Sequence, residues 1–128
     1  MPGLRTAVAI ACGYVVLLVM TLLGSVVIAL LMFHGNSVAI APPQYVAANA
    51  VLWLLAGITA GGLTARMAPS RPVYHAAALC VPILAIGVIA IFSSTAQSLL
   101  PHWYEPLVTA LGAAGAVTGG LLAKDSSA

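Results

Sequence analysis

Residues 6–33 read TAVAIACGYVVLLVMTLLGSVVIALLMF, and no charged side chain interrupts them. As an α-helix that rises about 1.5 Å per residue, this stretch is roughly 42 Å long. The hydrocarbon core of a bilayer is only about 30 Å thick, so such a helix crosses it with tilt or overhang. The apolar region of a secretory signal peptide has only about 7 to 15 residues. The stretch therefore predicts a transmembrane helix that is retained in the protein.

Three more apolar stretches follow the first one. They cover about residues 46–65, 73–92 and 106–123, and each is close to the ~20 residues that cross a bilayer as a helix. Pro82 lies inside the third stretch, where a kink is expected and is tolerated when nearby helices satisfy the freed backbone group. The sequence thus predicts a single all-α domain over residues 1–128, a bundle of four transmembrane helices.

The composition agrees with this fold class. Of the 128 residues, 62% are hydrophobic and 5% are charged, and the mean hydropathy is +1.14. A soluble domain carries about a quarter charged residues, so these values exclude a soluble protein, a nucleic-acid partner and a cytosolic enzyme of the usual kind. Both cysteines, Cys12 and Cys80, lie within apolar stretches and are expected to be buried thiols.

The basic residues predict how the chain is oriented. Arg5 precedes the first stretch, Arg66 and Arg71 lie between the second and third, and Lys124 follows the fourth. Short loops rich in Lys and Arg remain in the cytoplasm. The expected location is therefore the bacterial inner membrane, with several spans and with both termini in the cytoplasm.

A shift of 58 residues reveals an internal similarity. It aligns AGITAGGLTAR at 56–66 with AGAVTGGLLAK at 114–124, and six of the eleven positions are identical. The shift predicts two related helical hairpins, residues 1–66 and 67–128. Because both hairpins have the same orientation, they are expected to be parallel repeats, with a pseudo-two-fold axis along the membrane normal.

Glycines gather in these aligned segments. Lipid offers no hydrophobic drive for helix association, so small residues that let two backbones approach closely hold membrane bundles together. The second and fourth helices are therefore expected to be the close pair, although packing against a different helix is the simpler alternative. The predicted packing residues are Gly57, Gly61, Gly62, Gly112, Gly115, Gly119 and Gly120.

The turn between the second and third stretches combines three basic side chains. Arg66, Arg71 and His75 are close in sequence at one membrane surface, where anionic headgroups concentrate. They are candidate contacts for an anionic lipid. The alternative is that both arginines only fix the orientation of the chain.

Few residues suggest chemistry. His102 and Glu105 are three apart and are expected to be a solvated pair at the interface, with a metal-ligand or acid–base role as the alternative. No nucleophile beside a base, phosphate-binding loop or cysteine pair with metal spacing is found, so the expectation is no enzyme, no cofactor and no metal site. No ionisable Asp, Glu, Lys or Arg lies within a predicted span, which argues against a proton-coupled carrier.

The segment GGLTARMAP at 61–69, followed by Arg71, Pro72, His75 and Ala76, resembles a group of small bacterial inner-membrane proteins of unknown function. These proteins have a glycine pair that ends one span, an Ala-Arg, a short basic turn and a His-Ala that opens the next span. The resemblance covers about 17 of the 128 residues. It implies four spans in the inner membrane and no particular activity.

The leading functional hypothesis is a non-enzymatic accessory or interaction subunit. Its expected partners are membrane lipids and either further copies of itself or a larger membrane complex, with no nucleic acid. The alternative is a channel or facilitator for a small solute, which requires a polar path through the bundle. The hydroxyl side chains that could line such a path are Thr21, Ser25, Thr59, Thr64, Thr109 and Thr118.

Overall fold

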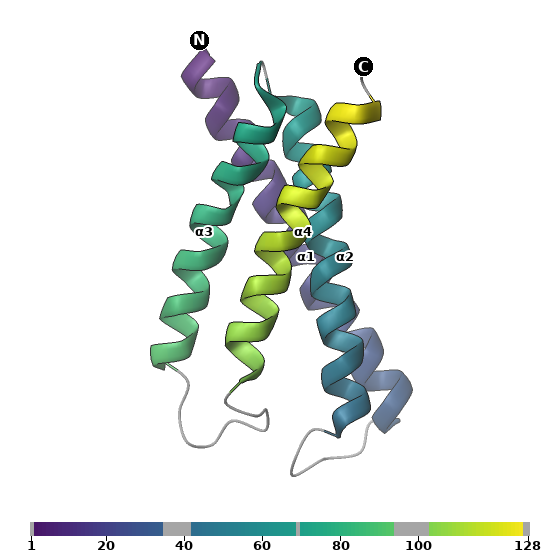
Figure 1. Cartoon of the computed structure of the whole chain (residues 1–128). Coiled ribbons are helices and arrows are strands. Elements are labelled where there is room, and N and C mark those ends of the chain that lie inside the picture. Colours follow the sequence, from purple (N-terminus) through teal and green to yellow (C-terminus); the bar gives the residue numbers. More distant parts are fainter. Residues whose placement is uncertain (1, 35–41, 69, 94–102, 127–128) are drawn as a thin grey trace.

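The computed structural model of the chain consists of four α-helices (Figure 1). It describes residues 2–34, 42–68, 70–93 and 103–126. The helices are α1 (Pro2–Phe33), α2 (Pro43–Met67), α3 (Pro72–Ser93) and α4 (Tyr104–Ser126). All four are long and apolar enough to cross a membrane. The predicted fold class, an all-α bundle of four transmembrane helices, is confirmed, and the chain is a multi-pass integral membrane protein.

Each helix extends beyond the apolar stretch that predicted it. Proline explains two of the starts, because it has no amide hydrogen and fits the first helical position, where that hydrogen would lack a partner anyway. Pro43 begins α2 after the extended Pro42, and Pro72 begins α3. Pro82 lies within α3, which remains helical on both sides of it.

Two residues outside the helices have a left-handed backbone that is uncommon for a side chain larger than hydrogen. His34 follows α1 with φ of 50°, and its amide donates to the Leu30 carbonyl at 3.0 Å. Arg71 precedes α3 with φ of 45°, and its carbonyl accepts from the amide of Tyr74 at 3.0 Å. Both residues lie where the chain changes direction at the end of a helix.

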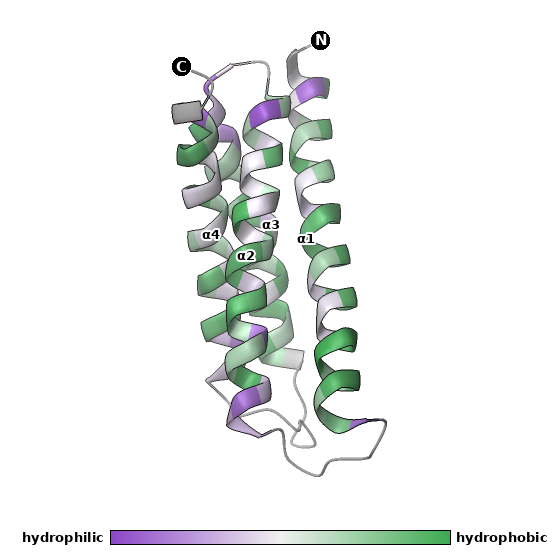
Figure 2. Cartoon of the chain, turned by 90° about the vertical axis from the view of Figure 1, so that its right-hand side faces the viewer, coloured by the Kyte–Doolittle hydropathy of each residue, from purple (hydrophilic) through white to green (hydrophobic). Residues whose placement is uncertain are grey.

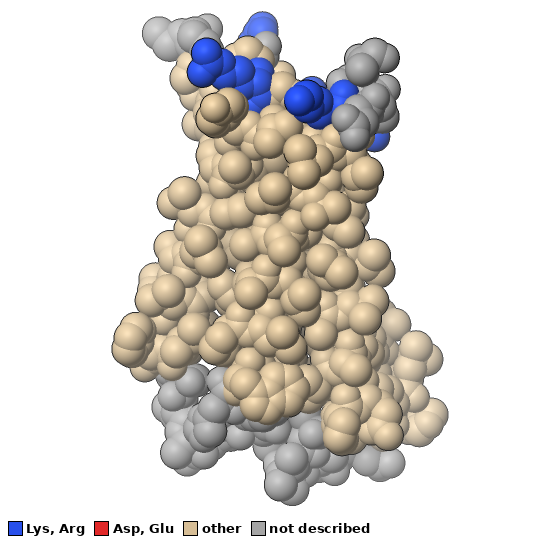
Figure 3. Space-filling view, in the orientation of Figure 1, with Lys and Arg blue, Asp and Glu red and all other residues tan. Residues whose placement is uncertain are grey.

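The helices alternate in direction, so that α2 and α4 run parallel to each other (Figure 1). The two termini and the α2–α3 turn lie at the same end, and Figure 3 shows the Lys and Arg side chains gathered there. We call this the basic end and the opposite one the far end. Viewed from the side, the most hydrophilic residues lie mainly toward the two ends (Figure 2).

The pair α2 and α4 forms the centre of the bundle. These two helices make the most extensive contact, followed by α1 with α2 and by α3 with α4. Within the described residues α1 and α4 do not touch, whereas α2 and α3 do. The bundle is therefore asymmetric, with α1 standing to one side (Figure 2).

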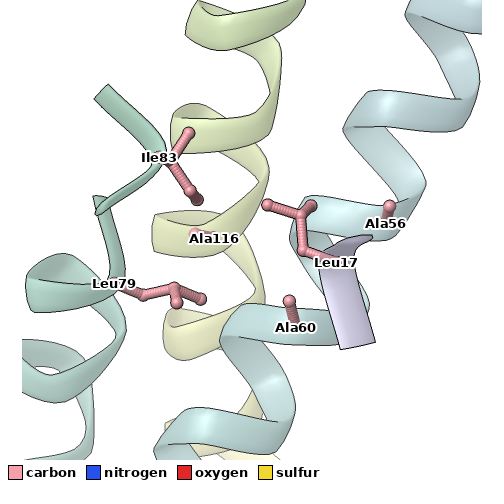
Figure 4. Close-up of a cluster of buried hydrophobic side chains, with 6 residues drawn as sticks. All are labelled: Leu17, Ala56, Ala60, Leu79, Ile83 and Ala116. Carbon is pink, nitrogen blue, oxygen red and sulfur yellow. The ribbon is translucent and has the colours of Figure 1, made fainter. Parts of the chain in front are cut away.

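The main core cluster divides its side chains unequally between helices (Figure 4). The central helices contribute only alanines, Ala56 and Ala60 from α2 and Ala116 from α4, while larger side chains come from the flanking helices α1 and α3. The larger ones are Leu17, Leu79 and Ile83. Because α2 and α4 are too close to hold large side chains between them, the flanking helices supply most of the core volume.

Candidate functional site

Glycines separate α2 from α4 at the closest part of the bundle. A methyl group added to Gly57 would lie 2.5 Å from the carbonyl oxygen of Gly112 and 3.1 Å from the Cα atom of Gly115. A methyl group on Gly61 would overlap the backbone of Ala116. Real Cβ atoms do not approach other atoms so closely, and here the opposing atoms are backbone, which cannot rotate away. The two helices therefore meet backbone to backbone along this seam.

The contacts across the seam are reciprocal. Just as Gly57 faces the Gly112 carbonyl, Gly115 faces the Leu54 carbonyl, and both distances from the added methyl group are 2.5 Å. In the same way, Gly61 faces Ala116 and Gly119 faces Ile58. Adding 58 to one member of each pair gives the corresponding residue of the other pair. This is the same shift that aligns the two halves of the sequence.

The remaining two predicted packing residues differ from each other. A methyl group on Gly120 would collide with the Ala76 side chain of α3. Gly62 is its counterpart in the shifted alignment, and a methyl group there would meet only the Gly119 carbonyl, at an ordinary 3.6 Å. Gly120 is therefore covered by a helix of this chain, whereas Gly62 lies next to open space.

That open space is a groove between α1, α2 and α4. It has a volume of about 700 Å³, and Thr59, Gly62 and Gly119 are among its lining residues together with apolar side chains. Arg66 lines it toward the basic end. The groove is found where α1 and α4 do not touch, and we refer to it as the α1–α4 groove.

The structure does not join Arg66, Arg71 and His75 into one cluster. Arg66 borders the α1–α4 groove, whereas the Arg71 guanidinium lies 5.7 Å from the centre of the Tyr74 ring. His75 lies against α1, with Nε2 at 2.9 Å from the Thr6 hydroxyl. A shared lipid contact by all three side chains is thus not supported by their neighbours.

His75 also fastens α1 to α3. Its Nδ1 is 3.1 Å from the Arg71 carbonyl, which can only accept, so Nδ1 carries a hydrogen and donates to it. In the neutral ring, Nε2 then accepts from the Thr6 hydroxyl. This interhelical bond at the basic end had no signal in the sequence, because Thr6 and His75 are 69 residues apart.

Three further polar bonds inside the bundle also went unpredicted. The Ser25 hydroxyl of α1 donates to Oδ1 of the fully buried Asn49 at 2.6 Å, and the Asn49 amide donates to the Tyr45 carbonyl at 3.0 Å. Thr64 donates to the Ala9 carbonyl at 3.3 Å, and the Cys80 thiol to the Ala113 carbonyl at 3.4 Å. Their sequence signal, a hydroxyl, thiol or amide within an apolar stretch, does not identify the partner.

The hydroxyls considered for a solute path do not share one. Thr59 and Thr118 are exposed on the outside of the bundle, and each donates to the carbonyl four residues earlier. Thr21 is buried and donates to the Leu17 carbonyl of its own helix at 2.8 Å. Ser25 and Thr64 are engaged with other helices, as described above.

A second, more enclosed cavity of about 220 Å³ lies toward the far end of the bundle. Glu105 and Thr109 of α4, Tyr14 of α1 and Trp53 of α2 are among its lining residues. The Trp53 ring packs over Gly112, and its side chain is hydrogen bonded to Tyr104. Glu105 is therefore on the wall of a cavity, while His102, its expected partner, lies outside the described residues. Within the described residues no three His, Cys, Asp or Glu side chains come together as a metal site.

Comparison with known proteins gives no further guide. No protein-family model matches the chain, and no curated protein and no solved structure is significantly similar to it. The functional argument therefore depends on the two cavities and on the seam.

Proposed function

We propose that this chain is a bacterial inner-membrane protein with both termini in the cytoplasm, and that it is a non-enzymatic accessory subunit. In this proposal the α1–α4 groove receives one transmembrane helix of another subunit. The observation that carries the proposal is the contrast between Gly120, which is covered by α3, and Gly62, which no helix covers.

The reciprocal seam explains why this contrast points to a helix. The contacts of Gly57 and Gly61 repeat as those of Gly115 and Gly119, so the central pair has local two-fold symmetry. In a fully symmetric bundle a helix would lie against Gly62 as α3 lies against Gly120. Helix α1 does not occupy that position, because it makes no contact with α4 in the described part of the chain. The groove thus has the place and the small-residue lining of a missing helix neighbour.

An anionic lipid is a second candidate for the same groove. Arg66 is exposed and lines the groove at the basic end, where a phosphate could accept hydrogen bonds from its guanidinium. An acyl chain would then lie along the apolar walls. This candidate keeps one of the three predicted lipid contacts and does not use Arg71 or His75.

A solute facilitator receives less support from the geometry. Its path would need polar groups that face a common space, whereas Thr59 and Thr118 are on the outside and Thr21 bonds to its own helix. Flux of small neutral solutes into vesicles that contain the purified protein is accordingly expected to equal that of empty vesicles.

Photo-crosslinking tests the accessory proposal. A benzophenone side chain at position 63, on the groove wall, is expected to give one discrete protein adduct in cells. The matched control is position 84, where Leu84 is exposed on α3 away from the groove. Gly62→Leu should abolish the adduct at position 63 while preserving the folded yield, because the added side chain would fill the groove and not the seam. The mass of the adduct shows whether the partner is another protein or a second copy.

Adducts with lipid alone at position 63 would overturn the accessory proposal in favour of the lipid candidate. Equal protein adducts at positions 63 and 84 would overturn it as well, because they would indicate random encounters in the membrane.

A further inference from the structure

The cavity at the far end combines a carboxylate, aromatic rings and apolar walls. It extends from Leu17 and Ile83, which belong to the core cluster, to Glu105 in the first turn of α4. Tyr14 lines it from α1 and Trp53 from α2. All four helices therefore contribute to this cavity.

The charge of Glu105 has no basic counterpart nearby. All Lys and Arg side chains are gathered at the basic end of the bundle (Figure 3), whereas α4 begins at the far end. The N-terminus of a helix carries a partial positive charge that favours an ionised carboxylate in its first turn. A negative charge on the wall of a low-dielectric cavity attracts cations strongly.

We propose that this cavity binds an ammonium group attached to an apolar body. Glu105 pairs with the ammonium group, and the face of Trp53 or Tyr14 adds a cation–π attraction. The apolar body lies toward Leu17 and Ile83. The cavity of about 220 Å³ is smaller than a typical drug-sized site of about 300 to 1,000 Å³, so the ligand is small.

Two sources offer this chemistry, a free organic amine and the headgroup of an ethanolamine lipid. Both place a cation beside Glu105 and apolar groups deeper in the bundle. The experiment below distinguishes them, and neither depends on the proposed role of the α1–α4 groove.

Fluorescence of Trp53 provides the test. The chain has two tryptophans, so Trp103→Phe leaves Trp53 as the sole reporter. In a micelle of an uncharged maltoside detergent, benzyltrimethylammonium should change the emission of Trp53 in a saturable manner. Glu105→Gln should weaken this binding at least tenfold, because the amide is of similar size but uncharged. The melting temperature of each variant shows whether it is folded.

A pair of α3 variants tests the location of the ligand. Ala90 lines the cavity and Ala85 is exposed on the outer face of the same helix. Ala90→Leu should weaken binding at least tenfold, whereas Ala85→Leu should leave it unchanged. Binding that is unaffected by Glu105→Gln, or weakened equally by both alanine substitutions, would overturn the proposal. If Ala90→Leu does not fold, Glu105→Gln alone decides.

Added lipid identifies the source. Competition by phosphatidylethanolamine but not by phosphatidylglycerol would assign the site to a lipid headgroup. Competition by neither lipid would assign it to a free amine. Equal competition by both would overturn the proposal, since phosphatidylglycerol has no ammonium group.

Discussion

Adjacent glycines in α2 face very different surroundings. A methyl group at Gly61 would overlap the Ala116 backbone, whereas one at Gly62 has ordinary contact distance to its nearest neighbour. Gly61→Ala is expected to destabilise the protein by about 1 to 3 kcal/mol, as overpacking does. Gly62→Ala is expected to be neutral or stabilising by up to about 1 kcal/mol, since alanine favours a helix.

Unfolding of both variants in mixed micelles with increasing sodium dodecyl sulfate would measure these free energies. Equal stability of the two alanine variants would contradict the backbone contact between α2 and α4.

Asn49 is the polar residue most deeply placed in the bundle. It is fully buried, accepts from Ser25 and donates to the Tyr45 carbonyl. A double-mutant cycle of Ser25→Ala and Asn49→Ala should give a coupling energy of about 0.6 kcal/mol, the average for such bonds between membrane helices. Unfolding equilibria of the four proteins give this value. Strictly additive effects would show that the bond between α1 and α2 does not contribute to stability.

At the scale of the helices, α3 is held to α4 by close fit. Gly87 of α3 faces the Thr109 side chain, and a methyl group at Gly87 would lie 3.0 Å from the Thr109 Cβ atom and still closer to its outer atoms. Threonine is branched at Cβ and has few rotamers into which it could move. Gly87→Ala should therefore lower the melting temperature, and adding Thr109→Ala should restore much of the loss.

The reverse order of substitutions is the control for this prediction. Thr109→Ala alone should have a small effect, because it removes atoms without creating an overlap. Failure of Thr109→Ala to rescue Gly87→Ala would place the effect of the glycine elsewhere than at the α3–α4 contact.

The arrangement of charge over the whole molecule makes the orientation testable. Ser70 is exposed at the basic end, and Trp103 is exposed at the far end, before α4. After replacement of Cys12 and Cys80 by serine, each position can carry a single cysteine. Trp103→Cys should react with a membrane-impermeant maleimide in intact cells, because the far end is expected to face outward. Ser70→Cys should react only after permeabilisation. The opposite pattern would reverse the proposed orientation.

The fold class could be predicted from the sequence because it depends on the length of apolar stretches. Residues 6–33 alone require a spanning helix, and the other three stretches follow the same rule. The helix ends were less accurate, since α4 begins at Tyr104 and not near Pro106. Hydropathy measures the apolar segment within a helix and does not register the turns that extend beyond it.

The contacts of particular residues could not be predicted in the same way. Gly13, Gly24 and Gly87 each face a side chain of a neighbouring helix, yet none of them belongs to a glycine pair that would attract notice. The wall position of Glu105 likewise depends on how four helices are rotated. Spacing within one helix identifies a face, but only the three-dimensional packing determines what that face meets.

The seam between α2 and α4 also has a consequence for how the protein is made. Gly57 and Gly61 find their partners, near Gly115 and Gly119, only 58 residues later in the chain. At a synthesis rate of about 5 to 20 residues per second, this delay is roughly 3 to 12 s. During that interval the nascent chain has its first helices in the bilayer while the glycine face of α2 meets only lipid or the insertion machinery. The last helix to leave the ribosome thus closes the centre of the bundle, and a chain truncated before α4 lacks the interaction around which the other helices are arranged.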